Sequence, residues 1–193
     1  MSPEDTAASI YIAPYDSRWP ARFADERMAI SEAITTWIEG GIEHVGSTAV
    51  PGLAAKPVID IMAGVRNLVD SRAAFGPLAK LGYLYAPYRT EVMHWFCKPS
   101  EEHRTHHLHL VEYLSPRWKA VIGFRDYLRL HPETAREYEA LKRALALRFS
   151  NDREAYTEAK SSFIDQIVSL TRPSFEAPAA GKGGSVSGPG LGP

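Results

Sequence analysis

At 193 residues, 45% of them hydrophobic, the chain is long enough to fold as one domain around a single core. Its 22 basic and 23 acidic residues give a formal net charge of −1, which argues against a polyanion-coating mode, so we expect no nucleic-acid partner. The one cysteine, Cys97, excludes an internal disulfide and is typical of a reducing compartment. No apolar run reaches the length of a membrane span and the N-terminus is acidic, so we expect a cytoplasmic protein with no membrane partner.

The first 115 residues predict a small mixed β-sheet with two helices packed against it, an α/β (α+β) fold. One helix is predicted from Trp19 to about Ile38, where Gly40-Gly41 end it, and a second over residues 68–81. The predicted strands are 42–45, 58–65, 83–85, 93–98 and 106–113.

From Pro116 to about residue 172 the pattern is helical, in three segments that break at His131-Pro132 and at the capping cluster 150–152. Residues after this point are mostly Pro, Gly, Ala and Ser, and they carry too few apolar anchors to offset the entropy cost of ordering. The sequence therefore predicts a loose N-terminus (1–9), one domain (10–172) with a sheet part (10–115) and a helical part (116–172), and a disordered tail (173–193).

The stretch 44–65, HVGSTAVPGLAAKPVIDIMAGV, contains the first candidate site. Gly46 and Ser47 follow an apolar strand, where a small backbone and a hydroxyl can approach a phosphate, although an ordinary strand-to-turn junction has the same residues. Lys56 can meet a phosphate at the same mouth, and it fits a solvated loop lysine equally well. Asp60 lies in an otherwise buried strand, and a buried carboxylate requires a cation or a hydrogen-bond donor.

The order of strand, Gly-Ser, spacer and strand with Asp resembles the nucleotidyltransferase superfamily. GSTAVPGLAAKPVIDI, together with YIAPYDSRWP (11–20), RTHHLHLVE (104–112), FRDYLRLHP (124–132) and DREAYTEAK (152–160), is similar more narrowly to the GrpB family. The resemblance covers roughly residues 10–170 and implies a minimal nucleotidyltransferase-like fold, sometimes joined to dephospho-coenzyme A kinase, with a reaction that is poorly defined for most members.

In the superfamily, the acid at the position of Asp60 holds Mg²⁺ on the nucleotide phosphates, and a second acid stands two residues later. This chain has Met62 there, on the same sheet face, so a standard two-metal site is in doubt. On the last predicted strand, His107 and His109 share one face and occupy the place of the superfamily's third acid. With Asp60 they would favour Mn²⁺, Zn²⁺ or Fe²⁺ over Mg²⁺; one histidine is alternatively a general base, or both are structural.

Three cations fall on the apolar stripes of the predicted C-terminal helices: Arg125, Lys142 and Lys160. At spacings of three and four residues they share the face that packs inward. Buried cations require anions, and the one internal Asp60 cannot satisfy all of them. We therefore expect a polyphosphate to lie between the helices and the sheet.

These residues predict an enzyme that binds a nucleoside triphosphate, ATP or another, with a divalent metal and acts on a small-molecule acceptor. Asp60, His107 and His109 would be catalytic, with Asp60 and His109 as metal ligands. The phosphate-binding residues would be Gly46, Ser47, Lys56, Arg125, Lys142 and Lys160. If the acceptor is a carboxylate, the product is an acyl-adenylate that can pass to an amine, which is the reaction of an amide-forming ligase. The alternatives are a non-catalytic module that binds a nucleotide or a coenzyme A precursor, and a metal-dependent hydrolase.

Overall fold

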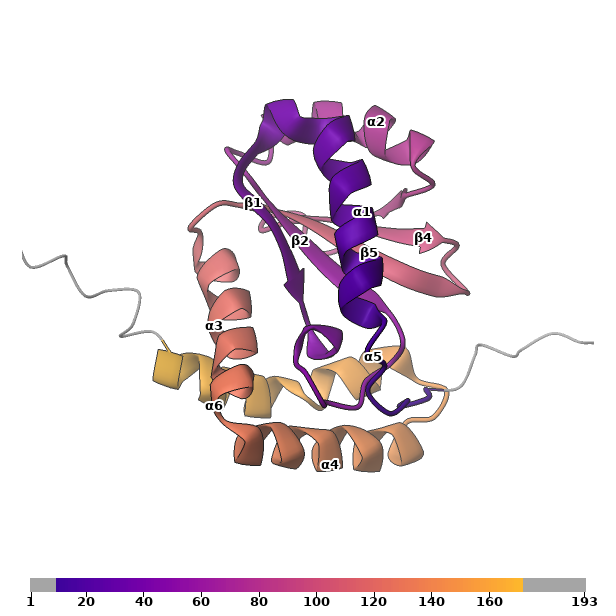
Figure 1. Cartoon of the computed structure of the whole chain (residues 1–193), viewed down its shortest axis with the longest axis vertical. Coiled ribbons are helices and arrows are strands. Elements are labelled where there is room, and N and C mark those ends of the chain that lie inside the picture. Colours follow the sequence, from indigo (N-terminus) through magenta and orange to yellow (C-terminus); the bar gives the residue numbers. More distant parts are fainter. Residues whose placement is uncertain (1–9, 172–193) are drawn as a thin grey trace, which may run out of the picture.

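The computed structural model describes residues 10–171 as a five-stranded mixed sheet with helices on both faces (Figure 1). This confirms the predicted fold class. The strands are β1 (Ile38–Val45), β2 (Ile59–Val65), β3 (Leu84–Ala86), β4 (His94–Pro99) and β5 (Arg104–Glu112), in the order β1-β2-β5-β4-β3. Only β2 and β5 are parallel. The predicted loose N-terminus and tail, and residue 172, lie outside the described residues.

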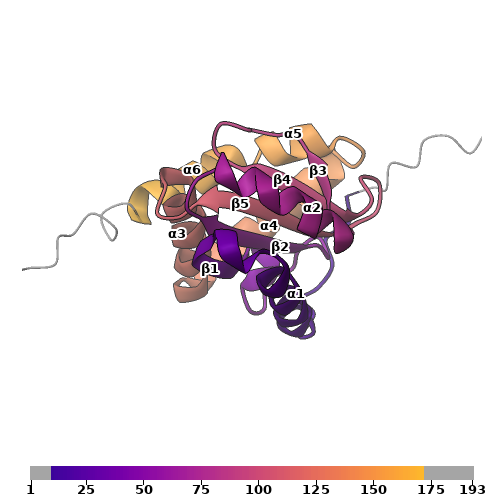
Figure 2. The same cartoon turned by 90° about the horizontal axis from the view of Figure 1, so that it is seen from above.

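Six α-helices and three short 3-10 helices complete the described chain. They are α1 (Trp19–Ile34), η1 (Thr35–Trp37), η2 (Ser47–Ala49), η3 (Asp70–Ala74), α2 (Phe75–Lys80), α3 (Pro116–Leu130), α4 (Pro132–Arg148), α5 (Arg153–Glu158) and α6 (Ser161–Thr171). Seen from above, α1 lies on one side of the sheet, and α5 and α6 lie on the other (Figure 2). Within the described chain, no helix is both long and apolar enough to cross a lipid bilayer.

The two sheet faces have different roles because side chains alternate along each strand. Ile61, Leu108 and Leu110 are fully buried in the main core, which α1 and α2 cover. The opposite face carries Asp60 and Met62 on β2, in register with His107 and His109 on β5. The predicted division of β5 into a packed face and a polar face is therefore confirmed.

Three predicted helices are interrupted in the structure. The first ends at Ile34 and continues as η1, and the second consists of η3 followed by α2. The third predicted C-terminal helix is two helices, with Lys160 at the junction between α5 and α6. There the Ser161 hydroxyl donates a hydrogen bond to the Glu158 carbonyl at 2.7 Å, a local bond that competes with helix continuation. Lys160 therefore lies in a turn between two helices, and not on the apolar stripe of one continuous helix.

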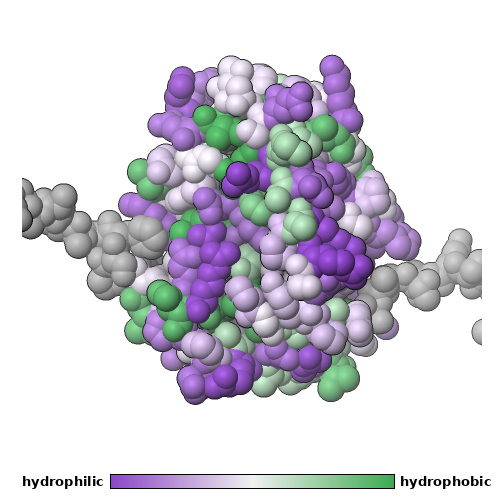
Figure 3. Space-filling view, viewed as in Figure 1, coloured by the Kyte–Doolittle hydropathy of each residue, from purple (hydrophilic) through white to green (hydrophobic). Residues whose placement is uncertain are grey.

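The helical part covers the end of the sheet where β1 terminates. In Figure 1, α4 runs across the end of the molecule toward which β1 points. Glu139 on α4 accepts a hydrogen bond from the Ala54 amide at 3.0 Å, and Lys142 donates one to the Ala54 carbonyl. These two bonds fix the loop between β1 and β2 against α4. The face in Figure 3 mixes hydrophilic and hydrophobic residues, and no single apolar patch dominates it.

Candidate active site

Gly46 connects β1 to η2 and lies directly against Asp60. Its φ of 69° falls in the left-handed region, which side chains other than glycine rarely adopt. A Cβ atom at this position would lie 2.4 Å from Asp60 Oδ2. The sequence indicated a glycine that leaves room for a ligand; the structure shows that it leaves room for the Asp60 carboxylate.

Asp60 and His107 form a hydrogen-bonded pair across the parallel strands β2 and β5. They are register partners, and His107 Nδ1 lies 2.9 Å from Asp60 Oδ1. Burial raises the pKa of Asp60, but the hydrogen bond from His107 and the electrostatic interactions with His107, His109 and Lys160 outweigh it, so the pKa lies below its ordinary value. An ionised carboxylate only accepts hydrogen bonds, so Nδ1 is the donor. His107 Nε2 is buried and has no partner among residues 10–171.

His109 lies one register step further along the same face but does not contact Asp60 by a hydrogen bond. Its Nδ1 lies 3.4 Å from the sulfur of Met93. Burial lowers the pKa of His109 to about 3, a shift that Asp60 opposes and Arg117 supports, so its ring is neutral at physiological pH. The structure thus pairs His107 with Asp60 and places His109 deeper.

Asp60 and His107 are the candidate metal ligands on this part of the sheet face. Within the described ranges, no group of three or more His, Cys, Asp or Glu residues is arranged to hold one. Met62, at the position of the superfamily's second acid, is fully buried with Val45, Val111 and Trp118. The predicted pair of Asp60 and His109 as metal ligands stays a prediction. A cation at Asp60 fits only if phosphate oxygens and water supply most of its ligands, which is typical of Mg²⁺.

Three lysines from distant parts of the chain gather around two tyrosines beside this pair. The ammonium groups of Lys56 and Lys160 lie 4.2 and 4.3 Å from the centre of the Tyr156 ring. Lys142, only 2% exposed, lies 5.0 Å from the centre of the Tyr138 ring. In the part of the chain that the structure describes, none of the three ammonium groups has a carboxylate oxygen within 4.0 Å. We call Lys56, Lys142 and Lys160 the lysine cluster.

The lysine cluster is only partly compensated by nearby carboxylates. Burial lowers the pKa of Lys142 to about 7 and those of Lys56 and Lys160 to about 8. The charge of Lys160 further lowers the pKa values of the other two lysines. Asp60 acts in the opposite direction on Lys56 and Lys160. A bound anion would relieve this repulsion.

Ser47 is linked to the lysine cluster by Tyr138 on α4, which contacts both Ser47 and Lys142. Burial raises the pKa of the Tyr138 hydroxyl, as does the charge of Asp60, while a hydrogen bond with Ser47 opposes the shift. Tyr156 is also buried, and burial raises its pKa to about 12. The sequence placed both tyrosines on apolar stripes and missed their polar role. The signal was their spacing, because each lies four residues before a lysine of the cluster.

Arg125 does not belong to the lysine cluster. It is 8% exposed, so its predicted inward direction is confirmed. However, its guanidinium donates to Glu43 at 2.6 Å, to Asp126 at 2.8 Å and to the His44 carbonyl at 3.0 Å. The expectation that three helical cations lack anionic partners within the protein is therefore wrong for Arg125, because β1 supplies Glu43 opposite the helix.

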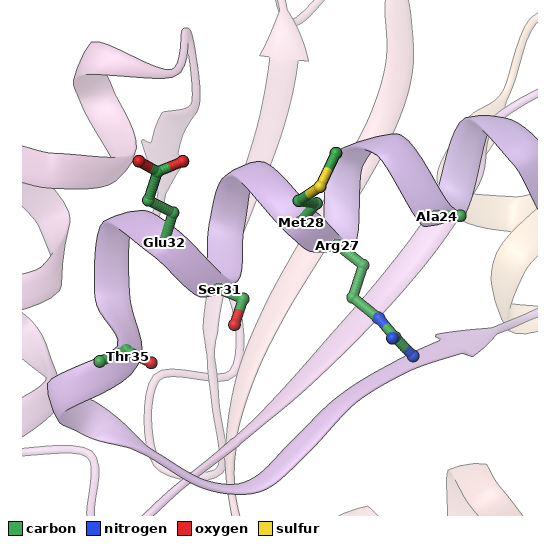
Figure 4. A pocket seen from close by; sticks show the side chains of 6 residues that line it. All are labelled: Ala24, Arg27, Met28, Ser31, Glu32 and Thr35. Carbon is green, nitrogen blue, oxygen red and sulfur yellow. The ribbon is translucent and has the colours of Figure 1, made fainter.

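A surface hollow lies away from these residues, along the outer side of α1. Its lining side chains come from α1 and the start of η1, and they spread apart without converging on a common point (Figure 4). They are Ala24, Arg27, Met28, Ser31, Glu32 and Thr35. This hollow brings together no pair of groups suited to catalysis, so the candidate site is the polar face around Asp60.

The mixed sheet, with Gly46-Ser47 and Asp60 at one mouth, defines a protein of the nucleotidyltransferase fold. The structure of the GLD-2/RNP-8 complex supports this fold at a TM-score of 0.51 and 13% identity, over 76% of this chain and 58% of that one. The chain belongs to the GrpB family, whose sequence model, described as GrpB protein, matches residues 9–170.

Relatives extend over nearly the whole described chain. "UPF0157 protein PA4798" of Pseudomonas aeruginosa is 41% identical over 164 residues, covering 82% of this chain and 66% of that protein. "Glutamate-rich protein GrpB" of Alkalihalophilus pseudofirmus is 34% identical, covering 82% and 94%. The crystal structure of conserved protein GrpB from Enterococcus faecalis has a TM-score of 0.77 at 28% identity, covering 86% of this chain and 99% of that one.

One further relative has a different name. "Dephospho-CoA kinase" of Mycolicibacterium paratuberculosis is 26% identical over 185 residues, covering 81% of this chain and 44% of that protein. The chain therefore corresponds to less than half of that protein. This chain also spans about two thirds of the P. aeruginosa relative.

We predict that Gly46→Ala destabilises the protein more than Gly82→Ala does. Both glycines have positive φ, 69° and 83°, so both variants carry a backbone cost of about 1–2 kcal/mol. Only at Gly46 does the new Cβ overlap Asp60, whereas nothing lies within 4 Å at Gly82. Urea unfolding gives both free energies, and equal losses would contradict the close approach of Asp60 to Gly46.

We predict that Met62→Asp destabilises the protein by about 3 kcal/mol or more, because it leaves a buried charge without a partner. Met28→Asp is the control, since Met28 is 68% exposed on α1 and a surface change there shifts stability by about 0.5 kcal/mol or less. Thermal and urea unfolding measure both. If Met62→Asp is as stable as the wild type, then the site accommodates a second acid after all.

Proposed function

We propose that this protein is a nucleotidyltransferase-type enzyme that binds a nucleoside triphosphate, ATP or another, and transfers its nucleotidyl group to a small-molecule acceptor. One observation carries the proposal: three lysines, of which Lys142 is buried and Lys56 and Lys160 are half-buried, gather beside Asp60, and in the described chain no carboxylate oxygen lies within 4.0 Å of their ammonium groups. Burying unpaired cations destabilises a fold, so a site that concentrates three of them is best explained by an anionic ligand. A polyphosphate matches this charge.

In this assignment the triphosphate lies between α4, the α5–α6 junction and the loop after β1. The lysine cluster holds the terminal phosphates, and the Ser47 hydroxyl donates to one of them. Arg125 stays outside the ligand shell because Glu43 and Asp126 already neutralise it. A divalent cation, Mg²⁺ or Mn²⁺, would be held by Asp60 and the phosphates and would supply neutralisation of the charge on the leaving pyrophosphate.

His107 is the proposed general base. Its Nδ1 donates a hydrogen bond to Asp60, so Nε2 is the nitrogen that takes the proton from the nucleophile. As the acceptor oxygen or nitrogen forms its bond to the α-phosphorus, the bond from that phosphorus to the bridging oxygen breaks and pyrophosphate leaves. Asp60 thus orients the base and stabilises the positive charge that it acquires. His109 has no proposed part in proton transfer because its ring is buried against Met93.

We predict that triphosphate affinity falls about tenfold or more between pH 7 and pH 9, because lysines with pKa values of about 7 to 8 lose their charge across this range. Binding favours the protonated lysines, so it takes up protons at pH 8. Calorimetry with ATP in buffers of different ionisation enthalpy measures both quantities. Constant affinity from pH 7 to pH 9 would show that ordinary, fully charged lysines or none bind the ligand.

The matched variants for this test are Lys160→Gln and Lys80→Gln. Removing Lys160 deletes a charge-assisted contact worth about 1.5–3 kcal/mol, so ATP affinity falls tenfold or more. Lys80 is exposed at the end of α2, and its variant keeps the wild-type affinity. If no nucleoside triphosphate, ATP included, binds the wild type with or without Mg²⁺ or Mn²⁺, then the proposed function is wrong.

A second candidate is a non-catalytic module that binds a nucleotide or a coenzyme A precursor. The observation that favours it is the buried Met62, which leaves a single carboxylate where the superfamily uses two. The relative named dephospho-CoA kinase makes dephospho-coenzyme A a reasonable second ligand to test. This module would bind with equal affinity in the presence and absence of metal and would release no pyrophosphate.

We predict that Asp60→Asn separates the two candidates. In an enzyme it lowers the transfer rate by about 10²-fold or more, because the amide neither holds the His107 tautomer nor stabilises its charge. Triphosphate binding by the lysine cluster persists. Pyrophosphate release with a panel of amine and hydroxyl acceptors measures the rate. A wild type without turnover on any acceptor would favour the binding module, and an Asp60→Asn variant with full turnover would exclude the mechanism above.

A further inference from the structure

A second group of basic side chains lies near His109, apart from the lysine cluster. Arg117 is the second residue of α3, and its Nε is buried with no hydrogen-bond partner within residues 10–171. Over the same range, no carboxylate oxygen lies within 4.0 Å of its guanidinium. Burial lowers the pKa of Arg117 and the positive charge of Arg89 lowers it further, so its main charged neighbour repels it. Arg117 is therefore a half-buried cation whose buried Nε has no partner in the described chain.

Arg89 lies on the exposed loop between β3 and β4. Its φ of 48° is in the left-handed region, and its carbonyl accepts hydrogen bonds from the Val92 and Met93 amides at 3.0 and 3.1 Å. A non-glycine residue there costs about 1 kcal/mol or more, and such strain clusters at ligand-binding sites. The loop thus holds Arg89 near Arg117 at the cost of a strained backbone.

The side chains around His109 are aromatic and apolar. Trp95 is the register partner of His109, and its ring centre lies 5.1 Å from that of His107. Met93 contacts His109, and the Arg104 guanidinium lies 4.9 Å from the centre of the Trp95 ring. Trp118, the residue after Arg117, packs in one cluster with Met93, and Met93 contacts His109. Arg117 therefore lies at the start of α3, on the His109 side.

We propose that Arg117, assisted by Arg89, binds the carboxylate of a small organic acid on the His109 side of the sheet face. A single half-buried guanidinium matches a monoanion, and its planar fork fits the two oxygens of a carboxylate. A polyphosphate fits the lysine cluster better because three cations converge there. The half-buried ring of Trp95 suits the carbon chain between the carboxylate and the reacting group.

The identity of this acid as the acceptor rests on the proposed function; carboxylate binding by Arg117 does not. His107 and His109 are two residues apart, which corresponds to about 6.6 Å along a strand. The anchored carboxylate is therefore not the group that reacts at His107. The acceptor that fits is an amino acid or hydroxy acid whose amine or hydroxyl lies several bonds from its carboxylate.

The test uses 4-aminobutyrate and 4-hydroxybutyrate as probes, with 4-aminobutyramide as the uncharged control. The NMR signal of the Arg117 Nε–H, identified by its loss in Arg117→Gln, is followed during each titration of the full chain. We expect both carboxylates to shift this signal and the amide to leave it unchanged. In calorimetry, Arg117→Gln weakens carboxylate binding about tenfold or more, because a charge-assisted bidentate contact is lost. Arg72→Gln, at an exposed position in η3, binds like the wild type.

Three results would overturn the carboxylate site: binding of the amide as tight as that of the acids, no binding of either acid, or unchanged affinity in Arg117→Gln. Inorganic phosphate that shifts the Arg117 signal at lower concentration than the acids do would overturn the assignment to carboxylates. The proposed function fails separately. Lys160→Gln loses ATP affinity but keeps 4-aminobutyrate binding if both assignments hold, and a wild type that binds the acids but not ATP supports the carboxylate site alone.

Discussion

The position of the Asp60 carboxylate is the constraint on which the rest of the site depends. One oxygen is held by His107 across the parallel pair of strands, and the other lies against Gly46, where any Cβ would collide with it. The backbone fixes the positions of both neighbours, because strand register places His107 beside Asp60 and the positive φ of Gly46 shapes the turn. The carboxylate thus has little rotational freedom. A fixed carboxylate orients a base and a ligand without the entropy cost of ordering a free side chain.

The lysine cluster beside that carboxylate lowers the stability of the fold, because its ammonium groups are desolvated without a direct carboxylate partner in the described chain. Cation–π contacts with Tyr138 and Tyr156 return only about 0.5–2 kcal/mol each, which does not replace an ion pair at a desolvated site. Burial lowers the pKa values of the three lysines in line with this shortfall. Arg125, which is also buried, is paired with two carboxylates. The C-terminal helices therefore contain a buried cation that is paired with carboxylates, Arg125, and a buried cation that is not, Lys142.

The sequence predicts the parts of this site that depend on periodicity and misses those that depend on what lies opposite. The alternation His107, Leu108, His109 settles which face of β5 is polar, because a strand has a period of two. A helical stripe likewise shows that Arg125 and Lys142 point inward. It does not show that Glu43 lies opposite Arg125, or that in the described chain no carboxylate oxygen lies within 4.0 Å of the Lys142 ammonium group. Tyr156 lies between Lys56 and Lys160 through a contact that bridges about a hundred residues, which local pattern does not encode.

The buried Met62 leaves one acid and one histidine for the chemistry that we propose on this sheet face. Its side chain connects β2 to Trp118 on α3, and that packing positions the helix whose second residue is Arg117. A carboxylate at this position would have to face an apolar cluster, so the second acid and the docking of α3 exclude each other. Once α3 is docked, the remaining hydrogen-bonding capacity beside Asp60 belongs to His107 Nε2. Loss of the second acid and a buried histidine nitrogen left without a hydrogen-bond partner thus lie side by side on one sheet face.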